Sequence, residues 1–255
     1  MSTVTPGNSN PANIDPALIK KYTVRGPRYT SYPTAPEWTD RVGPETYIKH
    51  IQENNQDANP NPLAFYFHIP FCPQRCHYCA CNVIITPKQD VLDHYVDLLS
   101  REIEMIGSRV HPDRKAIQLH LGGGTPTYLA PAQLDRLLER VTSVFQFKAD
   151  AERSIEVDAR ITTSQHLDIL RKHRFKRISF GVEEFHPAVQ QAIGRIQPFE
   201  HTYEFSRKCR EFGFESVNID LVYGLPLQTR ELFESTIDSI LRLDPDRIAL
   251  YNYAH

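Results

Sequence analysis

The sequence has no excess of charge of either sign. It contains 29 lysine and arginine residues against 31 aspartate and glutamate residues, a formal net charge of −2 in 255 residues. Domains that bind nucleic acid or anionic membranes usually show a surplus or a patch of positive charge. The composition therefore gives no reason to expect either partner, and the function has to be inferred from individual sites.

Long hydrophobic runs are also missing. No stretch of about 18 apolar residues occurs, so no membrane-spanning helix is predicted. The first residues, MSTVTPGNSNPANIDP, are polar and lack the basic segment followed by an apolar segment that marks a secretory signal. We therefore expect a cytoplasmic protein without membrane or nucleic-acid partners, and we take a monomer as its expected state.

Cysteine is scarce but unevenly distributed. Four of the five cysteines lie between positions 72 and 81. This number is too small, and the spacing too tight, for the disulfide framework of a small secreted domain. Clustering favours a metal centre instead. The fifth, Cys209, is interpreted as a buried or half-buried side chain on a helix.

Apolar strand-like segments alternate with helix-like segments along most of the chain. The strands are predicted at residues 63–70, 116–124, 154–159, 177–183, 216–224 and 246–255, and the helices between them at 90–107, 132–145, 164–173, 187–193 and 230–243. Helical spacing predicts that the first helix is apolar along Val91, Tyr95, Leu98, Leu99 and Ile103, and the second along Leu134, Leu137, Leu138 and Val141.

Such alternation predicts parallel βαβ units, which either close into a barrel or open into a doubly wound sheet. Polar residues or glycines recur at the C-terminal end of each strand, which is where an α/β barrel builds its site, and a doubly wound sheet would use fewer of those ends. We therefore predict an incomplete (β/α)6 barrel of the TIM type over residues 61–255. A disordered tail at 1–18 and an extended segment with a lead-in helix at 19–60 are expected before it.

The cysteine cluster follows the first strand directly, with Cys72, Cys76 and Cys79 in the pattern C-x3-C-x2-C. Thiolates select zinc, copper(I) or iron-sulfur clusters, and zinc is disfavoured because no second ligand pair follows downstream. An electron-transfer 4Fe-4S cluster needs four protein ligands. Cys81 is either that fourth ligand, or it does not ligate and one iron stays open. The spacing alone leaves both possible.

The pattern C-x3-C-x-aromatic-C, with Tyr78 as the aromatic residue, resembles the signature of the radical S-adenosylmethionine superfamily. The resemblance implies that three cysteines hold a 4Fe-4S cluster and that S-adenosylmethionine chelates the fourth iron. Cleavage of this cofactor would release a 5′-deoxyadenosyl radical. It also implies that the glycines at 122–124 contact the methionine end of the cofactor.

A narrower resemblance covers about Lys21 to His255. It is carried by the segments KYTVRGPRYTSYPTAPEW, YFHIPFCPQRCHYCACN, HLGGGTPTYL, SIEVD, RISFGVEEF, NIDLVYGLP and LYNYAH. Together they resemble the oxygen-independent coproporphyrinogen III oxidase family. The implied activity converts two propionate side chains of coproporphyrinogen III to vinyl groups, giving protoporphyrinogen IX in haem biosynthesis, with an unidentified electron donor.

This family resemblance also implies the residues that bind two S-adenosylmethionine molecules. For the molecule on the cluster they are Tyr66, Gly123 and Glu156. For the second molecule they are Tyr78, Gly124, Thr125, Glu183, Arg195, Asp220 and Ala254. Glu183 departs from the family, which usually has glutamine there, so the hydrogen-bond donors available at that position would differ.

Two alternatives to the oxidase remain. A related group of haem-binding chaperones lacks the PRYTSYPT segment and usually the fourth cysteine, whereas this chain has both, at 27–34 and at Cys81. A closed-cluster electron carrier would use Cys81 as a ligand. The family's C-terminal domain is not found in the 255 residues, and we expect the chain to bind a cluster whether or not it completes turnover alone.

Overall fold

The computed structural model describes residues 15–23 and 34–253, in two compact units, Met1–Tyr47 and Ile48–His255. Within the first unit, helix α1 (Pro16–Tyr22) and a short 3-10 helix η2 (Ala35–Glu37) are formed. Helix α1 corrects the prediction that residues 16–18 are disordered and that the chain is extended from Ile19. The cause is local, because the Asp15 side chain accepts from Ala17 N at 2.8 Å and Pro16 presets the first helical turn. The rest of the predicted tail lies outside the described residues.

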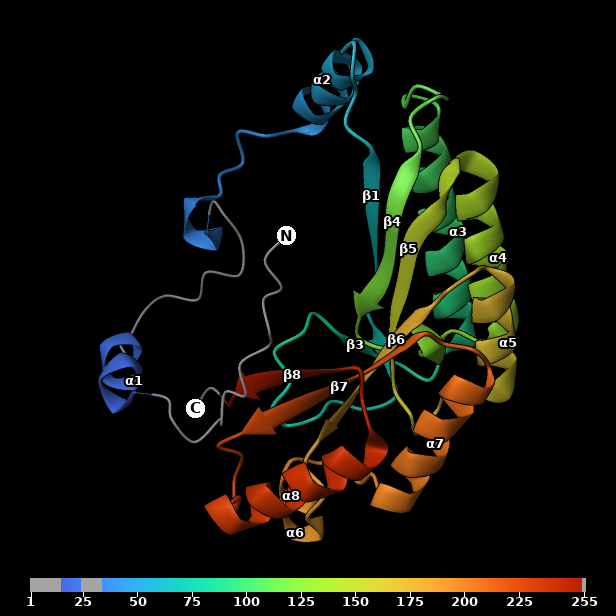
Figure 1. The fold of residues 1–255 in the computed structure, drawn as a ribbon. Coiled ribbons are helices and arrows are strands. Elements are labelled where there is room, and N and C mark those ends of the chain that lie inside the picture. The colour runs from blue at the N-terminus through green and yellow to red at the C-terminus, as the bar shows by residue number, and fades with distance from the viewer. Residues whose placement is uncertain (1–14, 24–33, 254–255) are drawn as a thin grey trace, which may run out of the picture. The chain divides into compact units, whose positions relative to one another are not determined.

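The second unit is built on one sheet of six parallel strands (Figure 1). The strands are β1 (Leu63–Ile69), β4 (Ala116–Gly123), β5 (Phe147–Val157), β6 (Arg177–Glu183), β7 (Ser216–Tyr223) and β8 (Arg247–Asn252), and they pair in that order. Sequential order is typical of a barrel, because a doubly wound sheet reverses its order partway across. Among the described residues β1 and β8 do not pair, so the predicted incomplete (β/α)6 barrel is confirmed as an open one.

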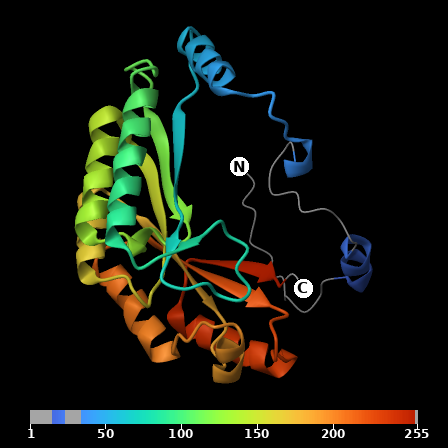
Figure 2. The same cartoon turned by 180° about the vertical axis from the view of Figure 1, so that it is seen from behind.

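Helices follow the strands as predicted. They are α3 (Gln89–Gly107), α4 (Pro131–Val144), α5 (Ser164–Lys172), α6 (Pro187–Ala192), α7 (Phe199–Glu211) and α8 (Arg230–Leu243), with α2 (Pro44–Asn55) preceding the sheet. Figures 1 and 2 show α3, α4, α5 and α7 against the outer face of the curved sheet. The short elements β2 (Phe71–Cys72), β3 (Ile84–Ile85) and η3 (Pro126–Tyr128) lie near the cysteines. No helix in the described ranges is long and apolar enough to cross a membrane.

The main core lies between the sheet and these helices. Leu134, Leu137, Leu138 and Val141 of α4 are fully buried, as predicted, and so is Cys209 of α7. In α3 the predicted apolar face is partly wrong. The buried residues are Leu92, Val96 and Ile103, whereas Val91 and Leu98 are exposed, because the stripe that packs on the sheet and on α4 lies about one residue further along.

The opposite, concave face of the sheet is polar. Strand residues alternate between the two faces, so Leu119, Ile155 and Phe180 pack in the core while their neighbours point the other way. Those neighbours include His120, Ser154, Ser179 and Asn218, which pair across adjacent strands. The concave face therefore leads toward a polar site at the C-terminal ends of the strands rather than toward a packed barrel interior.

Candidate functional site

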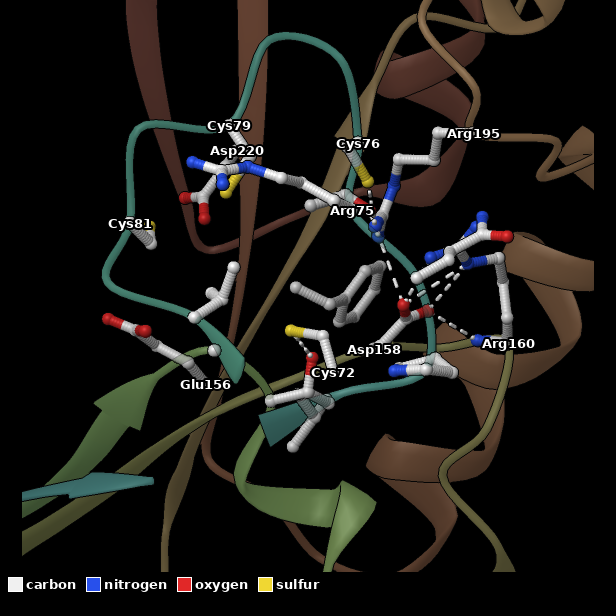
Figure 3. Close-up of a pocket in the computed structure, with 18 of the residues that line it drawn as sticks. Cys72, Arg75, Cys76, Cys79, Cys81, Glu156, Asp158, Arg160, Arg195 and Asp220 are labelled. Carbon is white, nitrogen blue, oxygen red and sulfur yellow. Dashed lines mark hydrogen bonds and ion pairs between the residues drawn. The ribbon is translucent and has the colours of Figure 1, made fainter. Parts of the chain in front are cut away.

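A cavity of about 170 Å³ lies at the C-terminal ends of the strands (Figure 3). It is lined by the cysteine loop and by the ends of β4, β5, β6 and β7. Of the predicted site residues, the following line it: Cys72, Cys76, Cys79, Tyr78, Gly123, Gly124, Thr125, Glu156, Glu183, Arg195 and Asp220. Tyr66 does not line the cavity, although its ring stacks on that of His120, its neighbour on β4. Ala254 lies outside the described residues.

The glycine turn after β4 holds one end of the cysteine loop. Gly124 N donates to the carbonyl oxygen of Ile69 at 2.9 Å, and Thr125 N donates to that of Phe71 at 2.8 Å. A Cβ at Gly124 would lie 2.8 Å from the carbonyl oxygens of Pro70 and Phe71. Glycine is therefore required here for close approach of two backbone segments.

The other end of the loop is attached to the end of α6. His77 N donates to the carbonyl oxygen of Ile193 at 2.9 Å, and His77 Nδ1 lies 2.9 Å from that of Ala192. Gln74 Nε2 donates to the carbonyl oxygen of Gly194 at 3.0 Å. These contacts fix the loop between β1 and α6 and orient its cysteines over the cavity.

The cysteines differ in their surroundings. Cys72 Sγ lies 3.3 Å from Thr125 Oγ1. A hydrogen bond from Cys81 lowers the pKa of Cys79 to about 6, and the same bond raises the pKa of Cys81. Cys81 is exposed, whereas the other three are half-buried. Cys79 therefore ionises more readily than an ordinary thiol, and the thiolate is the form that binds metal.

The three cysteines fit a group larger than one ion. In the parts of the chain that the structure describes, no three His, Cys, Asp or Glu side chains are close enough to hold a single metal ion. The sulfur atoms of Cys72, Cys76 and Cys79 instead surround the cavity (Figure 3). Three soft thiolates around a shared space suit an iron-sulfur cluster.

Next to the cysteines, two arginines share one buried carboxylate. Arg160 binds Asp158 through both side-chain oxygens, with its Nη2 2.6 Å from Oδ2, and Arg195 Nη1 lies 3.4 Å from Oδ2. Burial alone would raise the pKa of Asp158, but the two guanidinium groups outweigh it and the pKa is lowered. Neither Asp158 nor Arg160 is among the predicted site residues, although Asp158 belongs to one of the polar strand ends that the sequence predicts.

Tyr78 of the cysteine loop donates its OH to Glu183 Oε1 at 3.0 Å. Burial raises the pKa of Glu183 to about 7, although Arg195 opposes this shift. Burial and the charge of Glu156 raise the pKa of Asp220 to about 6. Both carboxyl groups therefore hold a proton at a higher pH than usual, so they can act as donors as well as acceptors.

Glu156 faces the cavity from the end of β5. Its Oε2 accepts from Gly123 N at 3.3 Å, and its Oε1 lies 3.2 Å from His120 Nε2. Arg195 Nε is buried and has no partner within the described ranges. Carboxylates together with an arginine donor that is still available suit a ligand bearing ammonium, carboxylate and hydroxyl groups, each of which needs a partner once water is excluded.

Comparison with known proteins supports this interpretation. The chain is 42% identical over 243 residues to the oxygen-independent coproporphyrinogen III oxidase of Helicobacter pylori, covering 95% of this chain and 53% of that protein. It is 45% identical over 241 residues to the protein of that name from Escherichia coli, covering 94% and 52%. The resemblance predicted from the motifs is thus confirmed, and the chain spans about half the length of these relatives.

A solved structure agrees with the fold. Coproporphyrinogen III oxidase from Escherichia coli, described as a radical SAM enzyme, superposes with a TM-score of 0.85 at 44% identity, covering 94% of this chain and 53% of that one. The family model of the radical SAM superfamily, whose members use a 4Fe-4S cluster and S-adenosylmethionine, matches residues 66–240. Since that match spans more than half of the chain and includes all three clustered cysteines, the chain belongs to the radical SAM superfamily.

Proposed function

We propose that this chain forms the radical SAM part of an oxygen-independent coproporphyrinogen III oxidase. The reaction would convert two propionate groups of coproporphyrinogen III to vinyl groups, giving protoporphyrinogen IX. The observation that carries the proposal is the cysteine-lined cavity, set in a chain 42% and 45% identical to relatives of that name. We also propose that the protein is a cytoplasmic monomer that receives electrons from an unidentified donor and has no nucleic-acid or membrane partner.

The proposed cluster ligands are Cys72, Cys76 and Cys79. When bound, the 4Fe-4S cluster and S-adenosylmethionine supply a 5′-deoxyadenosyl radical, a species that no side chain can generate. The chain contributes binding and orientation. Glu156, fixed by Gly123 N and His120, is placed to accept from one cofactor molecule, with Tyr66 nearby on β1.

A second S-adenosylmethionine is proposed to contact Tyr78, Gly124, Thr125, Glu183, Arg195, Asp220 and Ala254. Support comes from the shared cavity, to which all of these except Ala254 contribute. The family resemblance implies a glutamine at the position of Glu183. With a pKa of about 7, Glu183 is protonated in part of the molecules near neutral pH and then offers an O–H donor, as glutamine offers an N–H donor.

The haem-binding alternative is not supported by these relatives, which are named as oxidases. The electron-carrier alternative depends on Cys81. Cys81 also lines the cavity, but it is exposed and hydrogen-bonded to Cys79, whereas the other three are half-buried. We propose that it is not a ligand.

The test is anaerobic reconstitution of the full-length protein with iron and sulfide, followed by assay for 5′-deoxyadenosine and CO2 from coproporphyrinogen III. We expect both products, and we expect Cys76→Ser to bind little iron. The matched variant Cys81→Ser should keep its iron and its dependence on S-adenosylmethionine. A fully loaded protein that, with a competent reductant, releases neither product would refute the oxidase. Loss of the cluster in Cys81→Ser would favour the electron carrier.

A further inference from the structure

Arg195 connects the end of β6 to the cysteine loop. The residue is 7% exposed, and its Nη2 donates to the carbonyl oxygen of Gly181 at 2.8 Å and to Gln197 Oε1 at 3.1 Å. Its Nη1 lies 3.4 Å from Asp158 Oδ2 and 3.9 Å from Cys76 Sγ. Figure 3 shows this side chain directed at Cys76 and Asp158. The guanidinium group of Arg195 therefore contacts the cluster cysteine Cys76 while Gly181 and Gln197 hold its other nitrogen.

Gln197 fixes the orientation of the Arg195 guanidinium group. The residue is fully buried, and its Nε2 donates to the carbonyl oxygen of Gly181 and to Thr202 Oγ1, each at 3.2 Å. Since the amide nitrogen has two acceptors, the amide oxygen is the atom turned toward Arg195. Its backbone is held as well, because Gln190 bonds both Gln197 N, at 2.9 Å, and Gln197 O, at 2.7 Å.

Arg195 belongs to a buried network of charged groups. Two buried carboxyl groups, Asp158 and Glu183, interact with it, and Asp158 also binds Arg160 through both oxygens. Electrostatic interactions in such a buried site are stronger than in water. Cys76 is the cluster cysteine to which Arg195 donates.

We propose that Gln197 is a positioning residue that holds Arg195 against the Cys76 sulfur, and that this contact raises the reduction potential of the cluster. Reduction adds negative charge to a cluster, so a cation and an N–H donor at one of its sulfurs stabilise the reduced form more than the oxidised form. The inference rests on the proposed cluster, but not on the proposed porphyrinogen substrate.

The test compares the midpoint potential of the reconstituted cluster in the full-length protein and in variants, by reductive titration followed by electron paramagnetic resonance. Gln197→Met keeps the side-chain volume and removes the amide. We expect a more negative potential with unchanged iron content. Arg195→Lys keeps the charge, but one ammonium cannot contact Gly181, Gln197 and Cys76 together. It should also shift the potential downward.

Gln133→Met is the matched control. It makes the same replacement at another buried glutamine, whose Oε1 accepts from Ala130 N at 2.8 Å at the start of α4 and which does not line the cavity. It should lower thermal stability and leave the potential unchanged. Wild-type potentials in both Gln197→Met and Arg195→Lys would overturn the proposal, as would an equal shift in Gln133→Met. If Gln197→Met does not fold, Arg195→Lys decides. A loaded protein that releases no CO2 refutes the oxidase but leaves this comparison valid.

Discussion

Glu183 combines an unusual backbone with an unusual side-chain environment. Its φ of 66° lies in the left-handed region, which residues other than glycine seldom adopt. Its carboxyl group is buried beside Tyr78 and Arg195. Strained residues persist where the surroundings fix them, and they are frequent at functional sites. Here the strain places a titratable group in the cavity.

Replacement of this carboxyl group should change how stability depends on pH. In the cluster-free protein the pKa of Glu183 rises from an ordinary 4.5 to about 7, so the folded state holds the proton more tightly than the unfolded state. Stability is therefore lost as pH rises from about 4.5 to about 7. We expect Glu183→Gln to be more stable than the parent at pH near 8, by at most about 3 kcal/mol, with the difference gone near pH 4.

Urea midpoints at the two pH values provide the measurement. Glu200→Gln, which removes an exposed carboxyl group on α7, serves as the surface control. An equal stability difference between Glu183→Gln and the parent at both pH values would contradict the assigned pKa.

At the scale of elements, the turn after β4 decides where the cysteine loop lies. Strand β4 ends at Gly123, Gly124 follows it directly, and both line the cavity. A Cβ on Gly124 would meet the backbone of Pro70 and Phe71. Those two residues lead into Cys72. The turn and the loop are therefore one structural unit, although about 50 residues separate them in the sequence.

Gly124→Ala should displace the loop. The added Cβ would lie 2.8 Å from two carbonyl oxygens, which belong to backbone and cannot rotate away as a flexible side chain could. We expect lower iron binding after reconstitution and a loss of about 1–3 kcal/mol in unfolding free energy. Gly43→Ala, where nothing lies within 4 Å of the added Cβ, is the control. Wild-type iron content in Gly124→Ala would show that the loop tolerates the shift.

At the scale of the whole molecule, the cluster would connect distant parts of the second unit. The cysteine loop bonds to the glycine turn on one side and to the end of α6 on the other. A group bound to the folded state alone stabilises that state by mass action. Cluster binding is therefore coupled to the stability of the entire sheet.

Loading the cluster should raise the melting temperature. A stabilisation of about 2 kcal/mol corresponds to about 4–8 °C in a chain of this size. Anaerobic thermal unfolding of the protein before and after reconstitution measures the shift, and treatment with a chelator should reverse it. In Cys76→Ser we expect no shift. An identical melting temperature with and without bound iron would mean that the unfolded chain holds the iron as tightly as the folded state does.

The sequence by itself determined the strand–helix alternation, the position of the cysteines after the first strand and the polar strand ends, because these depend on local periodicity and on neighbours in the chain. It placed α4 correctly but misplaced the buried face of α3, which depends on the elements packed against it. Helix α1 was missed because a capping Asp15 and Pro16, not periodicity, start it.

Only the tertiary structure decided the strand order and the pairing of charges in the cavity. Arg195 lies 119 residues from Cys76 and 37 from Asp158 in the sequence, and no local pattern predicts these contacts or the amide of Gln197 that fixes them. The raised pKa of Glu183 has the same origin. Burial and distance between remote residues set such properties, and the folded chain alone defines both.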